Sequence, residues 1–388
     1  MTRSSPSPRV VKFHAPEMII GEGALAEAAL AASRLGMSRP LLVSDARVAA
    51  TAWFDELTDR ITRVGLQAER FTGVSPNPRA GEITAAFETY TRAGCDGIMA
   101  LGGGSVIDAA KGVAIVASNG GHILEYEGID RASRPLPPVV AIPTTAGSGS
   151  DVSQFCIVND LARSTKVTII GRGLVPDVSV VDPRVLATVP SDVTAQCGMD
   201  VLTHCIEAYV SIARSRMTDN LALQSISTTW RNLERLVDEP SDPEASVAMA
   251  YASLEAGMAF TNAILGAAHA MSHPVGGQCD APHGAINSVL LPHVIRYNAE
   301  VCADGFVDLA GAVGIATDGS AMVVAERLAD QVAKFAARIG MPGTLTPLGV
   351  QKSDIASLSV HALADSCMAT NPRQPDHDTV AGLYLDAL

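Results

Sequence analysis

The stretch GIMALGGGSVIDAAK, residues 97–111, decides the fold of the first half of the chain. Residues 97–101 form a short apolar run of the kind found in buried strands, and helical spacing resumes after the glycines. Similar apolar runs occur at residues 39–45, 138–142 and 178–181, with helix-period segments between them. Such alternation is typical of a buried parallel sheet. The sequence therefore predicts an α/β first half.

The pattern changes after Pro190, where strand signals disappear and Ala- and Leu-rich segments with helical spacing follow. Ser191–Thr194 offers a helix start, and prolines interrupt the segments that come later. At 388 residues the chain is too long for one ordinary hydrophobic core, so two domains are expected. We predict an α/β domain at residues 1–188 and an all-helical domain at residues 189–388.

The overall composition excludes several classes of protein. Hydrophobic residues make up 47% of the chain and charged residues 18%, which rules out disorder as a global description. The net charge of -13, without a dense Lys/Arg cluster, argues against nucleic acid as a partner. No apolar run approaches the roughly 18 residues of a membrane helix, and no signal peptide is apparent. Seven scattered cysteines argue against a disulfide framework, so we expect a cytoplasmic protein with no membrane partner.

The glycines at residues 102–104, followed by Ser105, are a candidate phosphate-binding loop. Glycines let the backbone approach a diphosphate closely, and the helix start that follows supplies free N–H groups. A purely structural turn would need the same glycines, and the GxGxxG fingerprint with an acid about 20 residues later is absent. A second small-residue loop, PTTAGSGS at residues 143–150, follows another predicted strand. Two such loops define one crevice at the carboxyl ends of the strands, which favours a nucleotide without identifying it.

Candidate metal ligands lie in the second half of the chain. Asp200 and His204 are four residues apart in a predicted helix and so share one face. The same spacing separates His269 from His273, and His283 follows in a turn. Any one of them alone is explained as a core histidine or a helix-face pair, but together they favour a shared cation that satisfies several buried polar groups. Imidazoles with one carboxylate suit Fe or Zn better than Mg or Ca.

These features together resemble the iron-containing (group III) alcohol dehydrogenases. The resemblance rests on the two loops, on HAMSHP at residues 269–274 with PHG at 282–284, and on TNPR at 370–373. It implies a dehydroquinate synthase-like architecture, in which an N-terminal dinucleotide-binding α/β domain meets a helical C-terminal domain and the metal lies between them. It also implies hydride transfer between a small alcohol or aldehyde and NAD, by a homodimer or a larger homo-oligomer.

The resemblance assigns roles to residues by position. The implied metal ligands are Asp200, His204, His269 and His283, with Fe(II) expected ahead of Zn(II). The implied cofactor contacts are Asp45, Asn77, Gly102, Gly103, Gly104, Ser105, Thr144, Thr145, Ser148 and Lys166. At Asp45 a carboxylate would accept the adenosine ribose hydroxyls and repel a 2′-phosphate, so NAD is expected over NADP. His273 matches a histidine beside the metal, and we expect it to relay the released proton.

The predicted substrate pocket contains Phe155, Phe260, Gln278 and Cys279. Many family members carry a bulky aromatic near Gln278 or Cys279, so the smaller residues here suggest a roomier pocket or a substrate with a polar tail. Glycerol dehydrogenases, maleylacetate reductases and dehydroquinate synthases share the architecture but not this ligand pattern. Two alternatives stay open: a nicotinoprotein that keeps its cofactor bound, and a nicotinamide-binding regulatory protein with little turnover.

Overall fold

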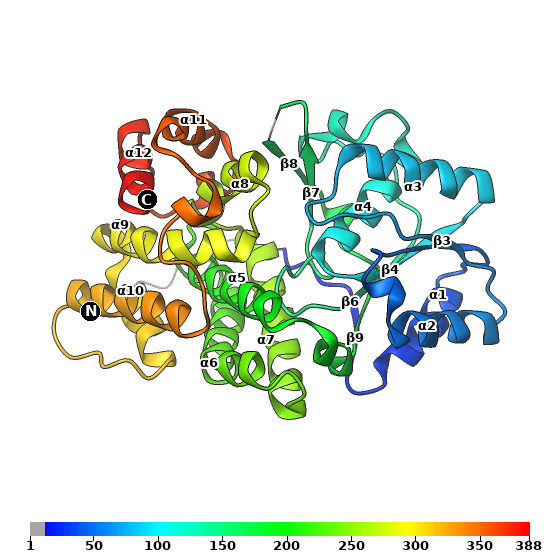
Figure 1. Cartoon of the computed structure of the whole chain (residues 1–388), viewed down its shortest axis with the longest axis horizontal. Helices are drawn as coiled ribbons and strands as arrows, with labels where there is room; N and C mark the ends of the chain where they lie inside the picture. Colours follow the sequence, from blue (N-terminus) through cyan, green and yellow to red (C-terminus); the bar gives the residue numbers. More distant parts are fainter. Residues whose placement is uncertain (1–11, 164) are drawn as a thin grey trace.

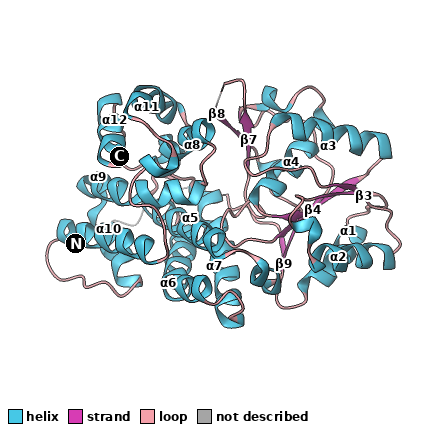
Figure 2. Cartoon of the chain, in the orientation of Figure 1, coloured by secondary structure: helices cyan, strands magenta, loops and turns pink. Residues whose placement is uncertain are grey.

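The computed structural model describes residues 12–163 and 165–388, which form a sheet-containing part and a helical part lying side by side (Figure 1; Figure 2). The strands are β1 (Glu17–Ile20), β2 (Pro40–Val43), β3 (Glu69–Phe71), β4 (Gly97–Gly102), β5 (Gly128–Ile129), β6 (Val139–Pro143), β7 (Phe155–Asp160), β8 (Thr165–Ile170) and β9 (Val178–Val181). The larger sheet has the order β1-β9-β6-β4-β2-β3, and its strand pairs are parallel. In the smaller sheet, β5-β8-β7, strands β7 and β8 pair antiparallel.

The central strand β4 shows why its run of residues is continuously apolar. Ile98 and Ala100 belong to a core shared with α3 (Ala80–Ala93) and α4 (Gly104–Asn119). Met99 and Leu101 belong to a second core, shared with α1 (Ala28–Arg34) and α2 (Ala52–Arg63). Both faces of the strand are covered, so every position in it is buried. The predicted α/β fold of the first half is therefore confirmed, including the four predicted strands β2, β4, β6 and β9.

The sequence did not predict β1, β3, β5, β7 or β8, and their positions explain why. β1 and β3 are the edges of the larger sheet, and they carry charged residues such as Glu17 and Arg70 instead of an apolar run. An edge strand packs against one neighbour, so polar side chains are tolerated on it. β7 and β8 form a hairpin outside the larger sheet and mix polar with apolar residues.

Residues 189–388, all of which are described, contain helices and no strand. The helices are α5 (Ser191–Val210), α6 (Arg216–Asp238), α7 (Pro243–Ala263), α8 (Ala267–Cys279), α9 (His283–Ala312), α10 (Ala321–Arg338), α11 (Ile355–Ala364) and α12 (His377–Asp386). One hydrophobic core joins them. β9 ends at Val181 and α5 begins at Ser191, so the domain boundary at residue 188 falls in the connection and stays a prediction.

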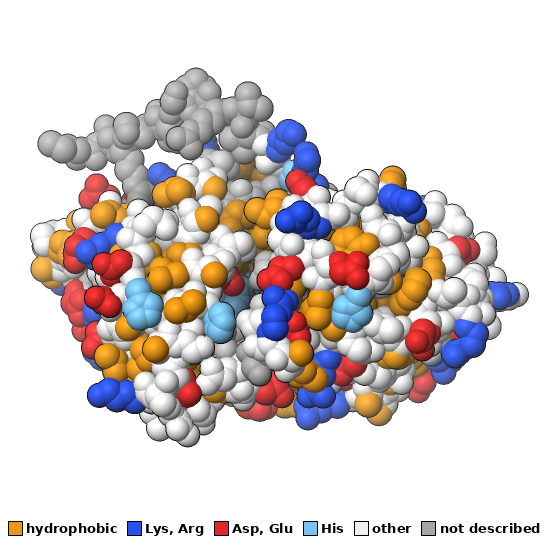
Figure 3. Space-filling model, turned by 90° about the horizontal axis from the view of Figure 1, so that it is seen from above, with side chains coloured by type: hydrophobic (Ala, Val, Ile, Leu, Met, Phe, Trp, Pro, Cys, Tyr) orange, Lys and Arg blue, Asp and Glu red, His pale blue; other side chains and the backbone are white. Residues whose placement is uncertain are grey.

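The surface is mixed in charge. Figure 3 shows acidic and basic side chains interspersed over one face, with hydrophobic side chains scattered between them. Within the described ranges, no helix is both long and apolar enough to cross a membrane.

Candidate metal and cofactor site

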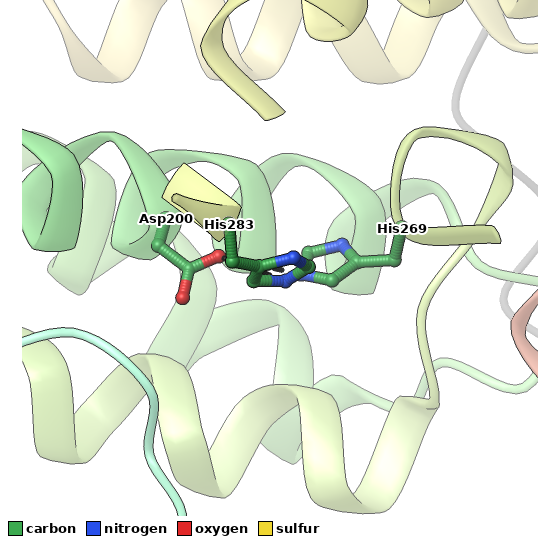
Figure 4. Close-up of side chains that lie close together, drawn as sticks. All are labelled: Asp200, His269 and His283. Atoms are coloured by element: carbon green, nitrogen blue, oxygen red, sulfur yellow. Dashed lines mark ion pairs between the residues drawn. The ribbon is translucent and has the colours of Figure 1, made fainter. Parts of the chain in front are cut away.

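Three of the predicted metal ligands converge on one point in the helical part. Asp200 of α5, His269 of α8 and His283 at the start of α9 each offer a ligand atom, and these atoms lie within 4.8 Å of one another (Figure 4). His269 Nε2 is 3.5 Å from Asp200 Oδ1, and His283 Nε2 is 3.7 Å from the same oxygen. Three segments that are distant in sequence thus meet at one carboxylate.

The fourth predicted ligand, His204, lies one helical turn after Asp200. Its Nε2 is 3.7 Å from Asp200 Oδ1, and its ring stacks on that of His269 with centroids 4.8 Å apart. Its Nδ1 is buried and has no hydrogen-bond partner among the described residues. The three predicted histidine ligands therefore surround the carboxylate of the fourth ligand, Asp200.

Two side chains that the sequence analysis missed hold the outer nitrogens of the histidines. Glu207 Oε2 lies 2.6 Å from His269 Nδ1, and Ser272 Oγ lies 2.8 Å from His283 Nδ1. When Nδ1 carries the proton in each ring, Nε2 presents a lone pair toward Asp200. Outer hydrogen bonds of this type orient histidine ligands in metal sites. Glu207 was detectable, because it lies seven residues after Asp200 and so shares its helix face.

The electrostatics of the cluster suit a cation. Burial alone would raise the pKa of Asp200, but the surrounding histidines hold it far below its usual value, so the carboxylate is ionised. Burial lowers the pKa of His204 to about 4 and that of His283 well below its usual value. Burial also opposes protonation of His269, yet Glu207 and Asp200 outweigh it and raise the pKa to about 9. The Asp200 carboxylate and the neutral imidazoles of His204 and His283 can thus donate lone pairs to a cation. Binding of the cation would displace the extra proton of His269.

Asn287 of α9 provides a test of whether these residues fit a metal. Its Nδ2 lies 2.8 Å from Asp200 Oδ1, 3.3 Å from His269 Nε2 and 3.2 Å from His283 Nε2. An amide has two N–H groups, so it cannot satisfy all three atoms when His269 has lost its proton and each of them is an acceptor. Its Oδ1 is buried and has no hydrogen-bond partner within the described chain. One divalent cation would satisfy all three acceptors, so the residues fit the metal that the sequence predicted.

His273 lies beside this cluster and is not among the converging ligand atoms. Its ring stacks on that of His283, with centroids 5.4 Å apart and planes 16° apart. Its Nδ1 is 2.7 Å from Oδ2 of Asp365, another residue that the sequence did not single out. The side chains of both His273 and Asp365 are buried.

The C-terminal TNPR motif holds the start of α8. Asn371 Oδ1 accepts a hydrogen bond from the amide N of Ala267, at 3.1 Å, and pairs with the side-chain amide of Asn298. The Arg373 guanidinium stacks over the ring of Tyr297, 4.1 Å from its centroid. The segment after α11 thus fixes the helix that carries His269 and His273.

The two glycine-rich loops meet at the carboxyl ends of β4 and β6. A Cβ at Gly104 would lie 2.6 Å from Ser148 Cβ, and one at Gly103 would lie 3.3 Å from Thr145 Oγ1. Only glycine allows this approach at position 104. The amide N of Asn77 donates to Ser105 Oγ at 3.2 Å, which brings a third segment to the loop. The two predicted loops therefore meet at the start of α4, where helix N–H groups favour a phosphate, and the binding of a nucleotide there stays a prediction.

A buried network on α4 fixes the distance between the loops. Asp108 accepts hydrogen bonds from Ser150 Oγ at 2.9 Å and from the amide N of Ile157 at 3.1 Å. Lys111 Nζ donates to the carbonyl oxygens of Ser153, at 2.8 Å, and Phe155, at 2.7 Å. Asp108 and Lys111 both lie in the stretch at residues 97–111. Their hydrogen bonds connect α4, which follows the first glycine-rich loop, to residues 150–157, which begin at the end of the second.

Two further predicted cofactor residues, Asp45 and Lys166, lie elsewhere in the sheet-containing part. Asp45 follows β2, the neighbour of β4, and its Oδ1 accepts the amide N–H groups of Arg47 and Val48 at 2.8 and 3.0 Å. Lys166 lies on β8, where burial lowers its pKa to about 8 against the opposing charges of Asp200, Asp280 and Asp108. A Cβ at Gly276 would lie 3.0 Å from Lys166 Nζ, so the hairpin packs directly on α8.

The predicted pocket residues fall into two groups. Phe260 stacks on His204 with ring centroids 4.3 Å apart, and Phe155 packs on Phe260 with centroids 5.8 Å apart. Gln278 and Cys279 lie at the end of α8, where Gln278 is exposed and Cys279 half-buried. The structure brings neither of them into the converging ligand set, and their pocket role stays a prediction.

A buried cluster of candidate metal ligands, in a chain whose two glycine-rich loops meet at the start of α4, is the arrangement expected of a metal-dependent dehydrogenase. Residues 15–183 match the family model described as iron-containing alcohol dehydrogenase, and residues 194–388 match that of the Fe-containing alcohol dehydrogenase family, C-terminal. The chain therefore belongs to the iron-containing alcohol dehydrogenase family. The predicted reaction class, hydride transfer by an oxidoreductase of the iron-containing type, is confirmed.

Individual relatives agree with this family. "Alcohol dehydrogenase 4" of Schizosaccharomyces pombe is 38% identical, covering 99% of this chain and 91% of its own length. The "NAD-dependent methanol dehydrogenase" of Bacillus methanolicus is 35% identical, covering 97% and 99%. A solved structure of "1,3-propanediol oxidoreductase" superposes with a TM-score of 0.95 at 36% identity, covering 98% of this chain and 100% of the other. These relatives support the predicted cofactor pair, NAD with a divalent metal.

Proposed function

We propose that this protein is an NAD-dependent dehydrogenase of small primary alcohols and the corresponding aldehydes, with one divalent metal bound by Asp200, His204, His269 and His283. Fe(II) is the metal expected from the family, and Zn(II) suits the same ligands. The observation that carries the proposal is the convergence of carboxylate and imidazole atoms within 4.8 Å, with the outer nitrogens of His269 and His283 held by Glu207 and Ser272. No purely structural role requires that arrangement of buried lone pairs.

Each part of the site has a task in this reaction. Bound there, a divalent cation would supply Lewis acidity toward an alcohol oxygen, and NAD would accept the hydride. The N-terminus of α4 and the loop around Thr145 would hold the diphosphate of NAD, and Asp45 would accept hydrogen bonds from the ribose hydroxyls. The alcohol carbon loses its hydride, and the hydroxyl proton passes to His273 Nε2 and then to solvent.

The substrate class follows from the pocket and the relatives. Named relatives act on methanol and on 1,3-propanediol, and both are small primary alcohols. Phe155 and Phe260 form an apolar wall against His204, which suits a short hydrocarbon chain. Because one of these relatives is named for a diol, short diols belong to the proposed substrates.

One contact favours a variant in which the cofactor is retained between turnovers. Asn77 Nδ2 donates to Asp280 Oδ1 at 2.8 Å and so links the segment over Ser105 to the loop after α8. A link across the mouth of the phosphate loop would slow exchange of NAD. Cofactor that stays with the protein through gel filtration, and is lost from Asp280→Ala, would support this nicotinoprotein variant.

We also propose a cytoplasmic homodimer or larger homo-oligomer with domains at residues 1–188 and 189–388. All seven cysteines are free thiols, as expected in a reducing compartment. Gel filtration with light scattering of the purified protein tests the oligomeric state, and limited proteolysis tests the domain boundary.

The central experiment measures NADH formation by metal-stripped protein, with short primary alcohols and diols, before and after addition of Fe(II) or Zn(II). Turnover should require metal and should vanish in His269→Ala. His361→Ala is the matched control, because His361 is an exposed histidine on α11. Absence of turnover with any metal, despite bound NAD, would instead support a nicotinamide-binding regulatory protein.

A further inference from the structure

A buried carboxylate from the C-terminal segment contacts the predicted proton relay. Asp365 precedes the short 3-10 helix Ser366–Thr370, and its Oδ1 accepts the amide N–H of Cys367 at 2.8 Å. Its other oxygen, Oδ2, is 2.7 Å from His273 Nδ1. The side chains are only 7% and 8% exposed, so water competes little for this bond. Asp365 is therefore anchored by its own backbone cap while it contacts the histidine.

The protonation of the pair follows from its surroundings. Burial would raise the pKa of Asp365, but His273 and the Cys367 N–H outweigh burial and lower it, so the carboxylate is ionised. An ionised carboxylate only accepts hydrogen bonds, so Nδ1 of His273 must carry the proton. In the neutral form of the ring, Nε2, across from Asp365, is then left with its lone pair. Stacking on His283 fixes the plane of the same ring.

A metal bound by this second cluster is a weaker explanation. Cys367 Sγ lies with the His273 and Asp365 atoms within 4.8 Å of one another. Burial raises the pKa of the Cys367 thiol well above its usual value, so the group is a neutral thiol. A metal binds the thiolate form, and removing the proton from this buried thiol would cost more than at an ordinary cysteine. The cluster is better explained as a hydrogen-bonded histidine–aspartate pair.

We propose that Asp365 is a positioning residue, whose carboxylate holds His273 as the Nδ1–H tautomer and so keeps Nε2 free to accept the alcohol proton. The inference rests on the proposed dehydrogenase function. In this step the O–H bond of the alcohol breaks, an N–H bond forms at Nε2, and the proton then leaves to solvent. Nothing is oxidised or reduced at the pair itself.

Asp365→Asn tests the kinetic consequence. Asparagine keeps the size and can still cap Cys367 through Oδ1, but its Nδ2 donates to His273 Nδ1 and favours the Nε2–H tautomer. We expect kcat to fall about 100-fold or more, as when a general base is lost, while KM for NAD and metal content stay unchanged. The control is Asp376→Asn, because Asp376 caps α12 through Thr379 in the same way but contacts no active-site histidine. A kcat for Asp365→Asn within a few-fold of wild type would overturn the inference.

A spectroscopic measurement reads the tautomer directly, without turnover. Protein labelled with ¹⁵N-histidine and loaded with Zn(II) gives two-bond ¹H–¹⁵N correlations that distinguish Nδ1–H from Nε2–H rings, and His273→Gln identifies the His273 signals. We expect Nδ1–H in wild type and in Asp365→Glu, and Nε2–H in Asp365→Asn. An Nε2–H ring in wild type would overturn the inference, even if Asp365→Asn does not fold.

The two proposals fail in different ways. If wild type oxidises no alcohol with any metal, the proposed function fails, while the spectrum still decides the tautomer. If wild type turns over and the His273 ring is Nε2–H, the role of Asp365 fails alone.

Discussion

Replacing Gly277 with alanine tests how closely the two halves of the site must pack. A Cβ at Gly277 would lie 2.7 Å from Thr165 Cα and 2.8 Å from the amide N of Lys166. Both are backbone atoms of β8, so rotating a side chain cannot relieve the contact. Gly277→Ala must therefore push the end of α8 away from the hairpin that carries Lys166.

The expected magnitude is a balance of two effects. Alanine in place of glycine within a helix stabilises by up to about 1 kcal/mol. Overpacking a tight contact costs about 1–3 kcal/mol. The balance predicts a free energy of unfolding that is about 0–2 kcal/mol lower than that of wild type. Gly382 of α12 is the matched control, because no atom lies within 4 Å of its Cβ position and alanine there should stabilise by the helical effect alone.

Urea unfolding of wild type and both variants measures this balance. Isothermal titration with NAD adds a second reading, since displacement of Lys166 should weaken NAD binding in Gly277→Ala and leave it unchanged in Gly382→Ala. If Gly277→Ala is as stable as Gly382→Ala, α8 does not need to approach β8 as closely as described, and the reasoning is refuted.

Burial raises the pKa of Glu255 to about 7, and its Oε2 has no hydrogen-bond partner within the described chain. A carboxyl whose pKa is higher in the folded state than in the unfolded state makes the protein less stable as pH rises from about 4.5 to 7. In urea unfolding near pH 8, the free energy of unfolding of Glu255→Gln should therefore exceed that of wild type by about 1 kcal/mol, allowing for solvent screening. Near pH 5 the two proteins should be equally stable. His204→Ala should weaken Zn(II) binding by at least about 100-fold in a chelator competition, since one of four ligands is lost, and an affinity equal to that of His361→Ala would remove His204 from the set. Asn371→Ala leaves the Ala267 N–H and the Asn298 amide unpaired, so we expect unfolding free energy to fall by about 1–3 kcal/mol. Asn232→Ala, which removes a single bond to Thr228 within α6, is its control, and an equal loss in both would contradict the role of Asn371.

The sequence predicted the elements in which burial follows a regular pattern along the chain. Each residue of β4 is buried on one face or the other, so Ile98 to Leu101 signal a strand by themselves. The ligands Asp200 and His204 were predictable for the same reason, because helical spacing places them on one face. The edge strands β1 and β3 escaped, since one-sided pairing leaves no continuous apolar run.

The partners of the histidines were harder to predict, because spacing along the chain says nothing about contacts between distant segments. Asp365 is 92 residues from His273, and no local pattern joins them. Ser272 lies between His269 and His273 and belongs to no recognisable motif of its own, although its hydroxyl contacts His283 Nδ1. Asn287 looks like an ordinary polar residue of α9 until the fold places its amide among three acceptors.

The dependence of α8 on Asn371 and of His273 on Asp365 has a consequence for how the protein is made. The larger sheet is complete once β9 has been synthesised, because β1 pairs with β9 and later residues add no strand to it. Domains generally fold in order of synthesis, so the nucleotide half can form on the ribosome while the helices are still unmade. The histidines receive their last supports only from the final segment of the polypeptide. Metal loading of a finished centre is thus an event of the released chain.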